Sequence, residues 1–328
     1  MTHATEDELS RYAFDPESVP NRHVVERHLE LCSECRRTLE FVRSIDDGLR
    51  DDITWELSDD LMSAPVNPAS TRVVLRELAQ QMAREDVDAE RLVAPMLANA
   101  TELAAIAHDR RFRTGGVVRL LCRATVDARE SDPERALELV DIAVAIAEVL
   151  EPRGNPGAGA VWELRGTAWK ERANALRLLG RLRDAVDAVD AAEDAFRHLH
   201  FSAFGLAGVE YVRATLLWER GEYTEALRLA IECAEEFDEL GDDSRVVLAR
   251  NLEAHVRVAT GETRAAREIF EQLLIFVDDD VWIARVATSL GHCYQIEGER
   301  TRAADSFRIA KEKLATLGVV DVMLVPAL

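Results

Sequence analysis

The sequence predicts an all-α fold, with a small helical domain followed by an α-solenoid, a long array of stacked helix pairs. Residues that break helices are few, with 16 glycines and 9 prolines among 328 residues. Hydrophobic residues make up 48% of the chain, but aromatic residues only 6%. Most of the hydrophobic residues are therefore aliphatic, with abundant alanine and leucine, and both of these residues favour helix. A turn motif also recurs along most of the chain, and such recurrence is typical of repeat proteins.

Residues 1–57 are predicted to form the small domain. Apolar residues recur at helical spacing in three short segments, which are residues 6–12, 21–32 and 34–49. Residues 58–70 contain two prolines and show no periodicity, which is typical of a linker. Three short helices bury little apolar area, and in domains of this size a bound metal often supplies the missing stability.

One cluster in this domain predicts a metal site. His28, Cys32 and Cys35 follow one another at offsets of four and three residues, so on a helix their side chains share one narrow stripe. Two thiolates, one imidazole and a further nitrogen complete a tetrahedral shell for Zn²⁺, and His3 is the candidate for the fourth ligand. His23 competes for that place, but it lies about 140° around the helix from His28.

The same residues carry a resemblance to the zinc-binding domain of bacterial anti-sigma factors. They are His3, the helix residues Leu9 and Tyr12, and the run His28-Leu29, Cys32, Cys35-Arg36 and Leu39. The resemblance implies that His3, His28, Cys32 and Cys35 hold zinc. It also implies a partner, an extracytoplasmic-function sigma factor bound through this domain and the helix after it. A purely structural zinc is expected, and a redox-sensing role is the alternative.

The segment after the cluster could supply an apolar stripe for such a partner, formed by Leu39, Val42, Ile45, Leu49 and Ile53. The alternative is that these side chains pack within their own domain or on the repeats. Unlike the usual anti-sigma layout, this chain has no apolar run long enough to cross a bilayer. A repeat array stands where the membrane anchor would be.

Residues 71–328 are predicted to form the array. A small or polar turn residue is followed five positions later by alanine in five places: Ser131 and Ala136, Gly180 and Ala185, Gly221 and Ala226, Gly261 and Ala266, Gly298 and Ala303. The fullest copy adds Gly291 and Phe307, which resembles the tetratricopeptide (TPR) pattern of a small residue facing an aromatic. Successive turns lie farther apart than the 34 residues of the standard repeat, so we expect lengthened helices. Residues 71–130 are expected to form a degenerate extension, and a non-repeating helical bundle is the alternative to the array.

Charge and cysteine usage narrow the class of function. The net charge is −21, which disfavours direct nucleic-acid binding and favours a basic protein partner. Five cysteines, three of them scattered through helical patterns, argue against a disulfide framework. The polar, acidic N-terminus lacks a signal-peptide pattern, and we expect a cytoplasmic location. No phosphate loop, dinucleotide fingerprint or nucleophile elbow is present, so an enzyme is not expected.

The sequence therefore predicts a cytoplasmic, zinc-binding, anti-sigma-like regulatory adaptor. Its TPR-like array would bind a second protein or peptide on the concave face. Two alternatives stay open: an interaction scaffold with a structural zinc domain and no role in transcription, or a sensor of a peptide or small ligand. The remaining cysteines Cys122, Cys233 and Cys293 are expected to be buried hydrophobic residues, and Asp278, Asp279 and Asp280 a solvated turn.

Overall fold

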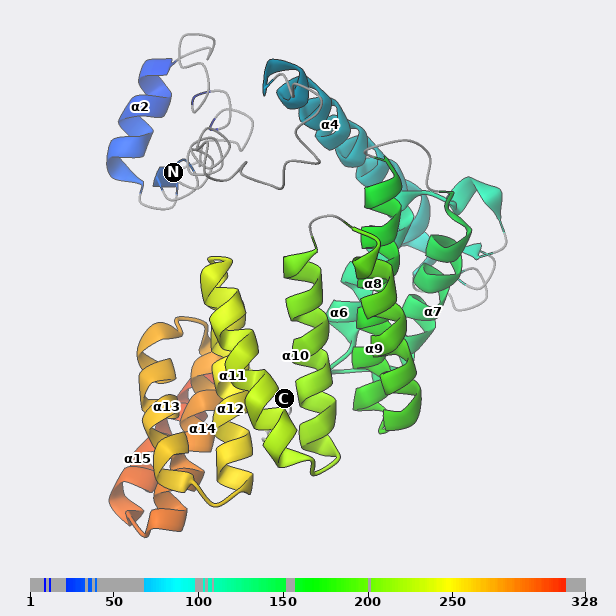
Figure 1. Cartoon of the computed structure of the whole chain (residues 1–328). Coiled ribbons are helices and arrows are strands. Elements are labelled where there is room, and N and C mark those ends of the chain that lie inside the picture. Colours follow the sequence, from blue (N-terminus) through cyan, green and yellow to red (C-terminus); the bar gives the residue numbers. More distant parts are fainter. Residues whose placement is uncertain are drawn as a thin grey trace. The chain divides into compact units, whose positions relative to one another are not determined.

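The computed structural model describes residues 9, 12, 22–32, 35, 36, 39, 68–97, 103, 106, 107, 109–151, 157–199 and 202–316. Every regular element in this part of the chain is a helix (Figure 1), which confirms the predicted all-α class. The chain divides into two compact units, Met1–Arg76 and Glu77–Leu328. The division falls inside a long helix, α4 (Pro68–Val93), and this helix starts within the predicted linker 58–70.

The first unit contains α2 (Arg22–Leu31), and the second contains a succession of longer helices. These are α6 (Gly115–Ala128), α7 (Pro133–Val149), α8 (Gly157–Leu178), α9 (Leu182–Arg197), α10 (Ala203–Glu219), α11 (Tyr223–Glu239), α12 (Asp243–Ala259), α13 (Thr263–Phe276), α14 (Asp280–Glu297) and α15 (Arg300–Thr316). Two short 3-10 helices, Ala94–Met96 and Arg110–Phe112, lie between α4 and α6.

The second unit is a TPR-like α-solenoid of helix hairpins. The five predicted turns join α6 to α7, α8 to α9, α10 to α11, α12 to α13, and α14 to α15, and the two helices of each hairpin pack together. The four turn glycines have positive φ, from 70° at Gly180 to 85° at Gly261, a conformation that glycine adopts without strain. The alanine five positions later is buried in each hairpin, from 0% exposed at Ala185 to 6% at Ala303.

Glycine also allows close helix packing at the aromatic side chains. A Cβ at Gly166 of α8 would lie 2.7 Å from the ring of Phe196 in α9, and one at Gly205 of α10 would lie 2.5 Å from the opposite edge of the same ring. Phe196 is only 3% exposed. Gly291 and Phe307, the pair expected from the fullest repeat copy, show the same contact at 2.6 Å.

Part of the segment 71–130 belongs to the first hairpin. Residues 71–130 were expected to be a degenerate extension, but α6 pairs with α7 as the first hairpin. Upstream of it, α4 lies so close to α6 that a Cβ at Gly116 would meet the backbone oxygen of Glu85 at 2.3 Å. The first hairpin has Ser131 instead of glycine at its turn, and Ala136 is buried five positions later as in the other hairpins.

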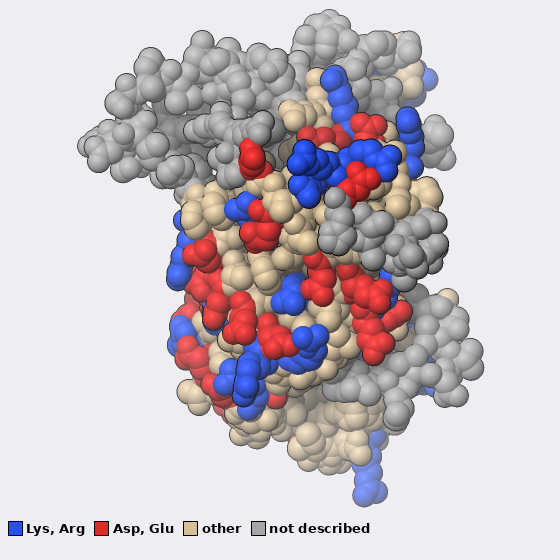
Figure 2. All heavy atoms as spheres, turned by 90° about the vertical axis from the view of Figure 1, so that its right-hand side faces the viewer, with Lys and Arg blue, Asp and Glu red and all other residues tan. Residues whose placement is uncertain are grey.

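The large negative charge is spread among ion pairs on the surface. Figure 2 shows Asp and Glu side chains lying among Lys and Arg side chains over one face of the molecule. Many pairs are three or four residues apart on one helix, as where Arg308 contacts Asp305 and Glu312. Each exposed pair of this kind contributes little to stability. In the described residues, no helix is both long and apolar enough to span a membrane.

Candidate functional site

The site is built on a small apolar core in the first unit. Leu9, Val25, Leu29, Cys35 and Leu39 are all at most 8% exposed and form one cluster, with Tyr12 and Cys32 packed against it. The Tyr12 hydroxyl donates to the Glu26 carboxylate of α2 at 3.3 Å. Tyr12 therefore ties the first predicted helix to α2 through both its ring and its hydroxyl.

Helical turns on either side of Cys32 fix the spacing of the three candidate ligands. The Cys32 N–H donates to the His28 carbonyl at 2.9 Å, and the Arg36 N–H donates to the Cys32 carbonyl at 3.2 Å. The Arg36 guanidinium reaches back to the Leu29 carbonyl at 2.8 Å, which is one of the carbonyls that a helix end leaves unsatisfied. These bonds hold the segment after α2 against the helix that carries His28.

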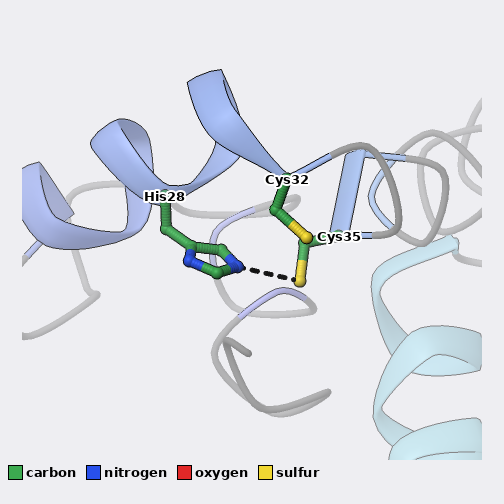
Figure 3. A group of neighbouring side chains, drawn as sticks. All are labelled: His28, Cys32 and Cys35. Atoms are coloured by element: carbon green, nitrogen blue, oxygen red, sulfur yellow. Dashed lines mark hydrogen bonds between the residues drawn. The ribbon is translucent and has the colours of Figure 1, made fainter. Parts of the chain in front are cut away.

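The three side chains converge (Figure 3). His28 Nε2 lies 3.3 Å from Cys35 Sγ, and one ligand atom from each of His28, Cys32 and Cys35 lies within 4.8 Å of the others. Cys35 is 3% exposed, while His28 and Cys32 are half-buried.

This arrangement could hold a metal ion. Bonds of about 2.0–2.3 Å in a tetrahedron place neighbouring ligand atoms about 3.5 Å apart, close to the distance between His28 Nε2 and Cys35 Sγ. Sulfur and imidazole ligands are those that zinc prefers. The cluster packs beside the apolar side chains of Leu9, Val25, Leu29 and Leu39, and a tetrahedral zinc site would need a fourth donor besides these three.

His23 and His3 are the two remaining histidine candidates for the metal site. His23 lies on the same helix as His28, but it is exposed and is not a member of the cluster. His3, the predicted fourth ligand, lies outside the described residues, so its place in the shell stays a prediction.

Leu39, the first residue of the apolar stripe predicted to bind a partner, is buried in the first unit. Leu39 is 7% exposed and packs in the core beside Cys35, so this side chain is committed to its own domain. The other four residues of the stripe, Val42, Ile45, Leu49 and Ile53, lie outside the described residues.

No protein-family model matches the chain, and no curated protein matches it. Among solved structures it is similar to BtubC (BKLC) from P. vanneervenii, with 17% identity, a TM-score of 0.50, and coverage of 75% of this chain and 96% of that one. It is also similar to a Podosopora anserina protein with nearly identical TPR-like repeats (18% identity, TM-score 0.44, 62% and 98% coverage). A third likeness is to aspartyl phosphate phosphatase F from Bacillus subtilis (10% identity, TM-score 0.46, full coverage of both chains).

At this level of identity the likeness to BtubC supports the helical repeat fold alone. The resemblance to anti-sigma zinc domains therefore depends on the residues quoted above and on their convergence in the structure.

The residues expected to be packing elements are buried in the second unit. Cys122, Cys233 and Cys293 are at most 6% exposed, and burial raises the pKa of the Cys122 and Cys233 thiols to about 12 and that of Cys293 to about 11. Of the three neighbouring aspartates, Asp278 and Asp279 precede α14 and Asp280 is its first residue; the Asp279 carboxylate caps the helix by accepting from the N–H groups of Val281 and Trp282.

One polar contact between two helices was not predicted from the sequence. His255 Nε2 lies 3.4 Å from the Ser289 hydroxyl, although 34 residues separate them. Burial lowers the pKa of His255 to about 4, with a smaller contribution from His292. The ring also packs edge-on against Phe270. A histidine this strongly desolvated is neutral at physiological pH and stabilises the contact between α12 and α14.

Proposed function

We propose that this chain is a zinc-binding regulatory adaptor. Residues 1–57 form an anti-sigma-like domain whose zinc is held by His28, Cys32 and Cys35, with His3 as the fourth ligand. The observation that carries the proposal is the convergence of the three ligand atoms within 4.8 Å. When bound, zinc supplies folding free energy to a domain whose apolar core is small. His28 and the two cysteines orient that metal, and the buried Cys35 joins it to the core.

The domain acts, in this proposal, on an extracytoplasmic-function sigma factor in the cytoplasm. Support comes from the pattern of Leu9, Tyr12, His28, Cys32 and Cys35, which matches anti-sigma zinc domains, and from the net charge of −21. A basic partner surface would complement that charge. The TPR-like array binds a second protein or peptide through the face formed by the first helix of each hairpin, as repeat surfaces commonly do.

Metal content tests the first half of the proposal. We expect the purified wild-type chain to hold close to one equivalent of zinc, and the Cys32→Ser plus Cys35→Ser variant to hold almost none. His28→Ala should lose most of the metal, whereas His23→Ala, which changes an exposed histidine on the same helix, should keep it. Equal zinc in the wild type and the double cysteine variant would refute the ligand assignment.

Co-purification from the native host tests the second half. A sigma factor should be recovered with the wild type and be absent with the zinc-free variant. If the wild type retains its zinc and no sigma factor is recovered, the role in transcription is refuted.

A second candidate function is an interaction scaffold with a structural zinc domain and no role in transcription. The burial of Leu39 in the core of the first unit favours it, because that residue is unavailable to a partner. Zinc would then be retained and the bound proteins would contain no sigma factor.

A further inference from the structure

The second unit contains a pocket lined by the first helices of its hairpins. Its volume is about 310 Å³, at the lower end of the range for sites that bind small ligands or short segments. We call this surface the inner pocket. Its lining residues are Val126, Arg129, Glu130, Lys170, Glu171, Asn174, Arg177, Leu178, Gly208, Tyr211, Val212, Thr215, Phe237, Arg245, Leu248, Asn251, Trp282 and Arg285. All but three of them come from α6, α8, α10, α12 and α14; Arg129 and Glu130 lie in the α6–α7 turn, and Phe237 belongs to α11.

The two ends of the array meet at this pocket. The Arg285 guanidinium of α14 forms an ion pair with the Glu130 carboxylate, which follows α6 and lies 155 residues away in the sequence. The first and fifth hairpins are therefore joined across the pocket, and the first helices face one another around it.

The inner pocket is basic although the chain is acidic. Five Lys or Arg side chains line it, but only two carboxylates do. Glu171 forms ion pairs with two of these bases, because one carboxylate oxygen lies 3.2 Å from Arg129 Nη1 and the other lies 3.2 Å from Lys170 Nζ. Two carboxylates outside the lining also pair with these bases, Glu219 with Arg177 and Asp242 with Arg245, so five cations face four carboxylates.

Arg245 is the base with the poorest pairing. Its guanidinium lies 3.8 Å from the ring centroid of Phe204, and its Nε is 3.5 Å from the Asp242 carboxylate. Its Nη1 is buried and has no hydrogen-bond acceptor among the described residues. A buried guanidinium N–H without an acceptor is unfavourable, and an incoming carboxylate oxygen would satisfy it.

Asn251 points to the chemistry of the rest of the ligand. It is 6% exposed and lines the same pocket. Its side-chain amide makes no hydrogen bond to any other described residue. An amide offers both donors and an acceptor, which is what the backbone of an extended peptide requires and what a simple anion cannot use in full. Leu248, Val212 and Trp282 add apolar contact surface.

We propose that the inner pocket binds an acidic linear peptide segment, with a carboxylate of the peptide held by Arg245 and its backbone held by Asn251. This inference rests on the proposed function, which assigns the inner face to a protein or peptide partner, and it adds the chemical class of that partner. The neighbouring bases Lys170 and Arg177 extend the positive surface for further acidic residues of the same segment.

Selection from a library of random dodecapeptides, with the full chain as bait, tests the proposal. Arg245→Gln is the test variant, and Arg308→Gln is the matched control because it removes the same charge from an exposed ion pair on α15. We expect Asp and Glu to be enriched in peptides selected by the wild type and by Arg308→Gln, and not by Arg245→Gln. A selected peptide should lose tenfold or more in affinity, by fluorescence anisotropy, when Arg245 or the acidic residues of the peptide are replaced.

Three results would overturn the proposal. The role of charge would be refuted if the wild type selected peptides without an excess of Asp and Glu. It would also be refuted if the Arg245→Gln variant selected peptides with the same acidic excess as the wild type. If such peptides still lose affinity for Asn251→Ala, the inner face remains a peptide site and the proposed function survives. If inorganic phosphate binds without any peptide, and its binding also depends on Arg245, the ligand of the inner pocket is a small anion and not a peptide. Selection of no peptide at all would refute peptide binding, while the zinc content, measured separately, would continue to test the metal domain.

Discussion

Replacing Gly166 with alanine should destabilise the repeat region, although alanine favours helix more than any other residue does. The new Cβ would lie within 2.8 Å of three atoms of the Phe196 ring. That ring is 3% exposed and has Gly205 close against its other edge, so it cannot move aside. Overpacking of this kind costs about 1–3 kcal/mol, and the gain in helix propensity offsets about 1 kcal/mol. We expect a net loss of about 1 kcal/mol.

Gly208→Ala is the matched control for this experiment. It also lies inside a helix, but its Cβ would meet only the Lys170 side chain, at 3.6 Å, which is an ordinary contact. This variant should therefore gain up to about 1 kcal/mol from helix propensity. Because the propensity gain is common to both variants, their difference of about 2 kcal/mol isolates the crowding against Phe196.

Urea unfolding followed by far-UV circular dichroism would measure both variants. Coincident tryptophan fluorescence would check that the array unfolds in one transition, since repeat proteins can lose hairpins separately. If Gly166→Ala proves as stable as Gly208→Ala, the close packing of α8 and α10 on Phe196 is not what requires glycine, and the reasoning fails.

Three further predictions concern single side chains of the second unit. Because His255 has a folded pKa of about 4 against 6.5 when unfolded, the unfolded state binds the extra proton. Stability should therefore fall as pH drops from about 6.5 to about 4, by about 3 kcal/mol, and His255→Asn should lack this component whereas the exposed His198→Asn should retain it. Asp279→Ala should cost about 1 kcal/mol in urea unfolding through loss of the α14 cap, and Asp278→Ala almost nothing; equal losses would contradict the assignment. In the Cys32→Ser plus Cys35→Ser variant, the three remaining thiols should react with a disulfide reagent at pH 8 only after unfolding. The reason is that burial raises their pKa to about 11 or 12. Fast reaction of the folded variant would show instead that these thiols are accessible.

The hairpins could be predicted from the sequence because their determinants are local. Gly298 ends α14 with φ of 80°, and Ala303 is buried five positions later. The positive φ of the glycine and the burial of the alanine are both set by the turn itself, so they recur wherever the turn recurs. The position of Phe196 between Gly166 and Gly205 was not predictable in the same way. It joins three helices, and nothing in the spacing of the residues states which ring approaches which glycine.

The candidate metal site was predictable for a similar reason. His28, Cys32 and Cys35 are separated by one or two helical turns, so the backbone alone brings them together. The pair of His255 and Ser289 shows the limit of this reasoning, because its two members lie on α12 and α14 and meet only when the hairpins stack. A ligand far away in the sequence, as His3 would be, belongs to this second class.

The inner pocket belongs to the second class as well, and it changes what the net charge implies. A charge of −21 indicates a basic partner for the exterior, where fields from many groups add and salt screens them over about 8 Å. A pocket is governed by the groups that line it, and screening by salt is weaker there because water is partly excluded. Arg129, Lys170, Arg177, Arg245 and Arg285 come from three helices and the α6–α7 turn, and no stretch of the sequence is basic enough to reveal them. The sign of a partner inferred from composition therefore applies to the outer surface alone. An acidic segment in the inner pocket and a basic partner on the exterior are compatible, since each would meet a surface of opposite charge.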